Sequence, residues 1–129
     1  MKNFSEATAI KPNLKLDISI LLVSVSECDC SVMVNDQLLA EGILNASVEL
    51  KTQIGLTDPI DISITVKNRQ HPQAVMISGI YIDSHEVMPT YLQHSNPPTS
   101  YLDFNGTWTL NIPNFYPWYH VITGQGWII

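Results

Sequence analysis

Four aromatic side chains near the C-terminus are the residues of this sequence best suited to binding a ligand. Tyr116, Trp118 and Tyr119 fall in one aromatic loop next to Pro117, and Trp127 follows two glycines close to the end. Aromatic rings offer large, flat apolar faces. Two roles are open for this segment. It can close the hydrophobic core, or it can form a surface platform that stacks on sugar rings or docks a partner.

The motifs of catalysis are absent from the sequence. It contains no GxSxG, no P-loop and no GxGxxG. A glycosidase needs two facing carboxylates, and each acidic residue that could supply one is better explained as a turn former or as part of a solvated strand face. These residues are Asp58, Asp61, Asp83, Glu86 and Asp103. We therefore expect a protein that is not an enzyme.

Metal ligands are sparse, and calcium is the one metal that the sequence leaves open. The four histidines (His71, His85, His94, His120) fit no recognisable metal spacing. Oxygen ligands for calcium gather at expected turns, although such residues also favour turns for local hydrogen bonding. They are Asn35, Asp36, Asp83, Asp103 and Asn105. No other cofactor is expected.

Two cysteines, Cys28 and Cys30, are expected to be free thiols in a reducing compartment. A disulfide between residues i and i+2 is strained and cross-links almost nothing. A zinc site would need a second pair of ligands at suitable spacing, and the sequence has none.

Composition excludes several classes of partner. The chain carries 6 Lys and Arg against 12 Asp and Glu, for a net charge of −6, and phosphate contacts need basic clusters, so we expect no nucleic-acid binding. The longest apolar run is too short to span a bilayer. Hydrophobic residues make up 45% and charged residues only 14%, which indicates that much of the surface is either uncharged or covered by other subunits. We expect an oligomer, because association would cover apolar surface.

The spacing of apolar residues predicts strands and the turns between them. Residues 60–67 alternate most cleanly, and residues 14–23, 46–54, 74–83 and 107–112 also read as strands. The second half of 14–23 is apolar on both faces, which predicts burial on both. Residues 24–29 are expected to form a turn region, while residues 86–88 are expected to form a short strand that stops at Pro89. Tight turns are predicted at Asn35-Asp36, Asp83-Ser84 and Asn105-Gly106.

These elements predict an all-β fold. No stretch shows the 3.6-residue period of a helix, and the count is eight or nine short strands. The expected architecture is an antiparallel two-sheet β-sandwich, jelly-roll-like, with a single domain over residues 14–129 and a flexible N-terminal arm over residues 1–13. Residues 1–12 lack the apolar core and cleavage site of a signal peptide, so we expect no export by that route.

Four segments of the C-terminal half form a recognisable pattern. They are Ile80-Tyr81-Ile82-Asp83 through Glu86-Val87, residues 101–110, Trp118-Tyr119-His120 and Gly124-Gln125-Gly126-Trp127. In this pattern the chain resembles small structural and accessory proteins of tailed bacteriophages and is loosely similar to calcium-dependent carbohydrate-binding β-sandwich modules. The resemblance covers about residues 61–129.

The resemblance and the missing catalytic motifs together imply a non-enzymatic phage virion structural protein. It would be a capsid decoration or cement protein, or a tail-associated accessory protein, made in the host cytoplasm and acting through contacts with other virion proteins. The alternative is an adhesin-like carbohydrate-binding module with an aromatic platform of Tyr116, Trp118, Tyr119 and Trp127, whose partners would include host surface glycans.

Overall fold

Nine strands and two short helical turns make up the described part of the chain. The computed structural model describes residues 15–55 and 58–112, so the predicted N-terminal arm and the C-terminal aromatic loop lie outside it. In chain order the elements are β1 (Lys15–Val25), β2 (Cys28–Val34), β3 (Gln37–Leu44), β4 (Ser47–Gly55), β5 (Ile60–Lys67), β6 (Ala74–Ile82), β7 (His85–Glu86), α2 (Met88–Tyr91), the 3-10 turn η2 (Leu92–His94), β8 (Tyr101–Leu102) and β9 (Gly106–Ile112).

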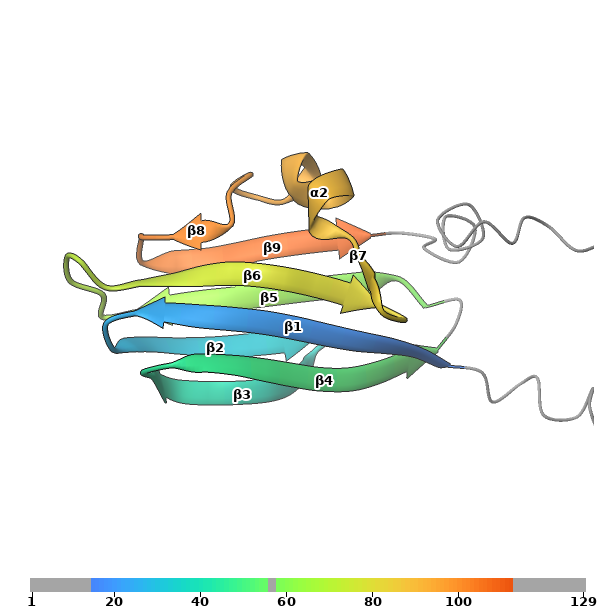
Figure 1. Cartoon of the computed structure of the whole chain (residues 1–129), viewed down its shortest axis with the longest axis horizontal. Helices are drawn as coiled ribbons and strands as arrows, with labels where there is room; N and C mark the ends of the chain where they lie inside the picture. The colour runs from blue at the N-terminus through green and yellow to red at the C-terminus, as the bar shows by residue number, and fades with distance from the viewer. Residues whose placement is uncertain (1–14, 56–57, 113–129) are drawn as a thin grey trace, which may run out of the picture.

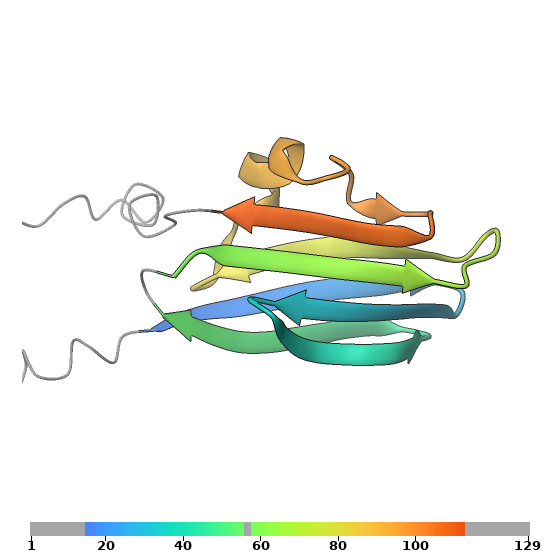
Figure 2. The same cartoon turned by 180° about the vertical axis from the view of Figure 1, so that it is seen from behind.

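The strands form two antiparallel sheets that lie face to face (Figures 1 and 2). Sheet A has the order β4-β1-β6-β7, with β8 also pairing with β6, and sheet B has the order β3-β2-β5-β9. This arrangement confirms the predicted two-sheet β-sandwich. Each sheet has an inner face toward the other sheet and an outer face toward solvent.

The core lies between the two inner faces and follows from the two-residue period of the strands. In β1, Leu16, Ile18, Ile20 and Leu22 are buried, and β5 buries every second residue in the same way. Trp108 of β9 is fully buried, and its indole Nε1 has no hydrogen-bond partner among the described residues. Packing of these inner faces holds the sheets in fixed positions, so the outer faces present their side chains at defined places.

The turn predicted over residues 24–29 is shorter than expected. Strand β2 begins at Cys28, and only Ser26 and Glu27 separate it from β1. Ser26 has a positive φ of 61°, which reverses the chain. Cys28 and Cys30 sit at alternate positions of β2 and point into the core, because an unpaired cysteine packs as a small apolar side chain.

The strand predicted to stop at Pro89 is also different in the structure. Strand β7 ends at Glu86, and Met88 begins the single turn of α2, with Pro89 in its first turn. Proline is well tolerated there because its missing N–H is not needed. The following connection is tied to β9 by two hydrogen bonds between the backbones of Asn96 and Thr109, of 2.9 and 3.0 Å. Neither helical turn is long or apolar enough to cross a membrane.

Candidate functional site

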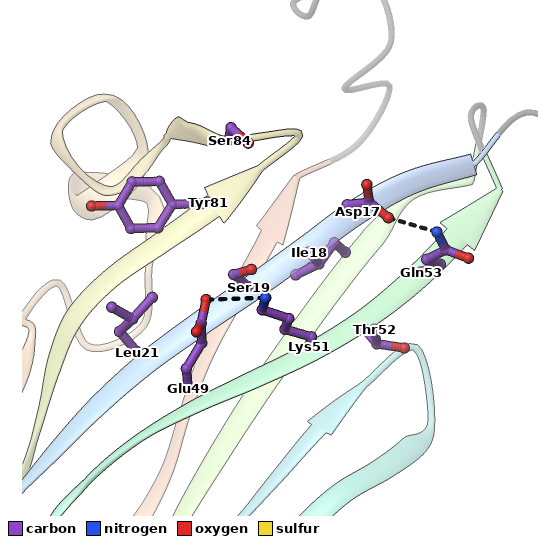
Figure 3. A pocket seen from close by; sticks show the side chains of 10 residues that line it. All are labelled: Asp17, Ile18, Ser19, Leu21, Glu49, Lys51, Thr52, Gln53, Tyr81 and Ser84. Carbon is purple, nitrogen blue, oxygen red and sulfur yellow. Dashed lines mark hydrogen bonds and ion pairs between the residues drawn. The ribbon is translucent and has the colours of Figure 1, made fainter.

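A broad hollow lies on the outer face of sheet A. It has a volume of about 880 Å³ and crosses β4, β1 and β6 (Figure 3). Most of its lining side chains carry hydroxyl, amide or charged groups. The lining residues are Asp17, Ile18, Ser19, Leu21, Glu49, Lys51, Thr52, Gln53, Tyr81 and Ser84. An open, polar hollow with one aromatic ring suits a hydroxyl-rich ligand better than an apolar one.

The aromatic ring of this hollow, Tyr81, lies back over its own strand. A Cβ atom placed on Gly79 would be only 2.8 Å from Cε1 of Tyr81. The absent side chain at Gly79 therefore lets the ring lie against the backbone of β6. A glycine inside a strand often marks such a close approach. In Figure 3 the ring of Tyr81 is seen nearly face-on beside its own strand, β6.

The hydrogen bonds at one end of the hollow hold its polar groups in place. Nε2 of Gln53 donates to Oδ1 of Asp17 over 2.6 Å. The backbone N–H of Asp17 donates to Oδ1 of Asp83 over 2.7 Å, and the N–H of Asp83 donates to the Asp17 carbonyl over 2.8 Å. This pairing joins the start of β1 to the β6–β7 turn. The amide and carboxylate groups of Gln53 and Asp17 therefore face the hollow in a fixed arrangement.

A charged pair lies further along the same face. Nζ of Lys51 is 3.8 Å from Oε2 of Glu49, and both side chains are exposed. Such a surface pair contributes at most about 1 kcal/mol to stability. Both groups therefore remain free to exchange their mutual contact for hydrogen bonds to a ligand.

The far end of the same face is apolar. Val23 of β1 lies opposite Met76 of β6, which lies opposite Tyr101 of β8. Tyr101 is 42% exposed and Met76 is 37% exposed. Val23 and its neighbour Leu21 are only half-buried, so the prediction that the second half of β1 is buried on both faces is wrong. Nothing in the described ranges packs over these residues, because no further layer covers sheet A (Figure 1).

The platform predicted from the sequence lies outside the described residues. Tyr116, Trp118, Tyr119 and Trp127 all follow residue 112, so their role as sugar-stacking residues stays a prediction. The aromatic residue that the structure places at a hollow is instead Tyr81. The sequence contains one signal for Tyr81. Gly79 and Tyr81 are two residues apart in a predicted strand, so they share one face of it.

The turn residues predicted as calcium ligands lie at opposite ends of the sandwich. Asn35, Asp36 and Asp83 are at the end where β1 begins, and Asp103 and Asn105 are at the other end (Figure 1). Oδ1 of Asn35 accepts the backbone N–H of Asp61 over 2.8 Å, and Oδ1 of Asn105 accepts that of Arg69 over 2.7 Å. Among residues 15–55 and 58–112, no three His, Cys, Asp or Glu side chains gather into a group that could hold a metal.

The buried titratable groups are held in their neutral forms. Burial, and to a lesser extent the neighbouring Cys28 and Asp29, raise the pKa of Cys30 to about 11. Burial also raises the pKa of the Cys28 thiol and of the Tyr91 hydroxyl. The thiolate is the reactive form of cysteine, so neither thiol is activated as a nucleophile.

Comparison with known proteins identifies structural neighbours but no family. No protein-family model and no curated protein matches the sequence. Among solved structures, the chain is similar to vCBM60, a calcium-dependent carbohydrate-binding module, with a TM-score of 0.51 and 14% identity over 77% of this chain and 91% of that one. It is also similar to vCBM60 in complex with galactobiose, with a TM-score of 0.52 and 13% identity over 74% of this chain and 99% of that one.

At these identities the likeness shows a shared β-sandwich fold. The solved structures therefore support the fold that the sequence resemblance to calcium-dependent carbohydrate-binding modules implies. No comparison supports the resemblance to phage proteins or a place in a capsid or tail, and these stay predictions.

Proposed function

We propose that the protein binds carbohydrate on the outer face of sheet A and has no catalytic activity of its own. The observation that carries this proposal is the ring of Tyr81 lying over Gly79 beside a polar hollow. The fold shared with vCBM60, one structure of which contains galactobiose, supports it. Among the two functions predicted from the sequence, these observations favour the carbohydrate-binding alternative.

The chemistry of the hollow matches that of a sugar ring. A sugar presents an apolar C–H face, which packs on an aromatic ring, and hydroxyl groups, which both donate and accept hydrogen bonds. Tyr81 provides the ring, Asp17 and Glu49 provide acceptors, and Lys51 provides donors. Gln53 provides both, through its amide. Several polar groups around one aromatic surface are typical of a ligand site that fixes orientation.

The length of the face favours a chain of several sugars. Along β1, Tyr81 lies opposite Ser19 and Met76 lies opposite Val23, while Tyr101 lies beside Met76 on β8. Four residues of strand span about 13 Å. Tyr81 and Tyr101 therefore offer two aromatic contacts on one face, the first in polar surroundings and the second in apolar ones.

Calorimetric titration of the full chain with a broad panel of oligosaccharides and soluble polysaccharides tests the proposal. We expect at least one glycan to bind, and Tyr81→Ala to weaken that binding by about tenfold, the effect of about 1.4 kcal/mol. Tyr81→Phe should bind as the wild type does, because the ring supplies the contact. Ser63→Ala, on the outer face of sheet B, is the matched control and should leave binding unchanged.

Two outcomes would count against this site. No binding across the panel would remove the proposed function. Binding that Trp118→Ala abolishes and Tyr81→Ala leaves intact would place the sugar site in the C-terminal aromatic loop.

Calcium is a separate question for the same titration. The carboxylates of Asp17 and Glu49 are engaged by Gln53 and Lys51, so we expect a chelator to leave binding on this face unchanged. If the chelator abolishes binding, the sugar is held by a calcium site elsewhere in the chain.

The role in a phage particle has its own test, which does not depend on glycan binding. Quantitative mass spectrometry of purified particles should find many copies if the protein decorates a capsid and a few to a few dozen if it belongs to a tail. Its absence from the particles would end that hypothesis.

A further inference from the structure

Strand β4 forms a free edge of sheet A. In the order β4-β1-β6-β7, the strand pairs on one side with β1, and no described strand pairs with its other side. Its sequence, residues 47–55, contains no proline, and its pairing with β1 runs without a register shift. An edge of this kind presents unpaired N–H and C=O groups, which can pair with the strand of another molecule.

Apolar residues are also partly exposed along this side of the sandwich. β4 and β3 lie together along this side (Figures 1 and 2). Between them is a small hollow of about 130 Å³, lined mostly by apolar residues. Val48 and Leu50 of β4 line it and are only half-buried. A partner strand placed against β4 would remove more of this apolar surface from water, which favours association.

We propose that two copies of the protein associate through antiparallel pairing of their β4 strands, with the two-fold axis at Leu50. In this register Leu50 lies opposite Leu50 of the second copy. Glu49 lies opposite Lys51 of the second copy, and Lys51 lies opposite Glu49 of the second copy. The pairing is self-complementary, as a two-fold interface requires. Oppositely charged residues that face each other across two strands stabilise the pair.

The charges select this register over its neighbours. A shift by one residue would place the polar, outward-facing residues of one β4 strand opposite the apolar, inward-facing residues of the other. A shift by two residues keeps the faces matched but places Glu49 opposite Glu49, or Lys51 opposite Lys51. Like charges that face each other are destabilising. Among the registers centred near the middle of β4, only the one at Leu50 pairs both charges with their opposites.

The other edge on this side of the molecule is less suited to self-pairing. Strand β3 is the edge of sheet B, and its pairing with β2 shifts register between Val32 and Met33. A bulge of this kind distorts the edge and opposes regular addition of another strand. Glu41, the one charged residue of β3, would also lie opposite itself in a pairing centred on it.

The association would join the two copies of sheet A into one continuous sheet. Because the two-fold axis is perpendicular to that sheet, both outer faces would lie on the same side. Glu49 and Lys51 also line the hollow proposed to bind sugar, but the association is measured without sugar, so its test does not depend on glycan binding.

Sedimentation velocity of the full chain over a concentration series tests the proposal by charge exchange. The wild type should form a dimer. Glu49→Lys and Lys51→Glu should each raise the dimer dissociation constant by at least about tenfold, because each replaces two attractive contacts with two repulsive ones. The double variant Glu49→Lys/Lys51→Glu should return it to near the wild-type value. Lys67→Glu, at an exposed position of β5 in sheet B, is the matched control and should have no effect.

Two results would contradict the proposed interface. The first is a wild type that remains a monomer at the highest attainable concentration. The second is a dimer that does not respond to charge exchange in the expected way. If either single variant leaves the dimer intact, or if the double variant fails to restore it, the contact lies elsewhere. Glu49 and Lys51 are exposed, so the variants should fold, and far-ultraviolet circular dichroism checks this directly.

Discussion

Replacing Gly79 with alanine should weaken sugar binding without removing the aromatic ring. The new Cβ atom would lie 2.8 Å from Cε1 of Tyr81 and 3.4 Å from its Cζ. A comfortable contact between two carbon atoms is about 3.5 to 4.0 Å. The edge of the ring must therefore move outward by at least about 0.7 Å, the difference between 3.5 and 2.8 Å. Movement of one edge tilts the ring away from the sheet.

The expected size of the effect follows from the area of the ring. A tyrosine buries up to about 200 Å², and one face of its ring accounts for roughly a third of that. At about 25 cal/mol per Å², the contact is worth about 1.5 kcal/mol, or roughly tenfold in affinity. Tyr81→Ala should lose all of this. Gly79→Ala should lose part of it, about threefold, because the ring remains but no longer lies parallel to the sheet.

Stability should change little in this variant. The atom that must move is at the far end of a side chain on the surface, which can turn outward. Glycine inside a strand is also less favourable than alanine, by about 0.5 to 1 kcal/mol. We expect the free energy of unfolding of Gly79→Ala, measured in urea, to stay within about 1 kcal/mol of the wild-type value.

Two measurements on the same preparations decide the outcome. Calorimetric titration gives the affinity for the best glycan of the panel, and urea unfolding gives the stability. If Gly79→Ala binds as well as the wild type while Tyr81→Ala is weakened, the orientation of the ring does not matter and the reasoning from Gly79 is wrong. If both variants bind normally, the sugar does not contact this face.

Two further predictions concern the core. Trp108→Phe should lower the free energy of unfolding in urea by about 1 to 2 kcal/mol, less than the 3 to 5 expected for Trp108→Ala, because the phenylalanine ring still fills most of the space that alanine leaves empty. The lost indole N–H has no partner among the described residues, so its removal breaks no hydrogen bond there. An equal loss for both variants would contradict this. The folded-state pKa of Cys30, about 11, lies above its ordinary value of 9.0, so its burial contributes stability that is fully present below pH 9.0 and is lost as the pH rises toward about 11. Cys30→Val cannot ionise and should make stability less dependent on pH over this range, whereas an unchanged dependence would mean that another group causes it.

The strands were largely predictable because their spacing is a local property. In β5, Ile60, Ile62, Ile64 and Val66 alternate with polar residues, and the structure buries each of the four. The turn at Asn35-Asp36 was equally clear, and both residues adopt the positive φ that such a turn needs. Alternation and turn chemistry act over a few residues, so they could be read without knowing which strands become neighbours.

Some local features differ from the prediction because two interpretations fit the same residues. The cysteines of β2 stand beside Glu27 and Asp29, a polar pattern that is also typical of a turn. The structure packs Cys28 and Cys30 in the core with Val32, which makes the segment an alternating strand. Pro89 is compatible with the end of a strand, but it also suits the first turn of a helix.

The candidate site could not be found from the sequence, because its residues come from three strands that are distant in the chain. Asp17, Gln53 and Tyr81 face one hollow only because β4 and β6 both pair with β1. The sequence by itself determined an all-β protein with alternating strands, tight turns and a net negative charge. The tertiary structure decided which strands are neighbours, which face of each sheet meets solvent and which edges are left free. Those features arise from contacts between distant residues, and a pattern read along one chain does not contain them.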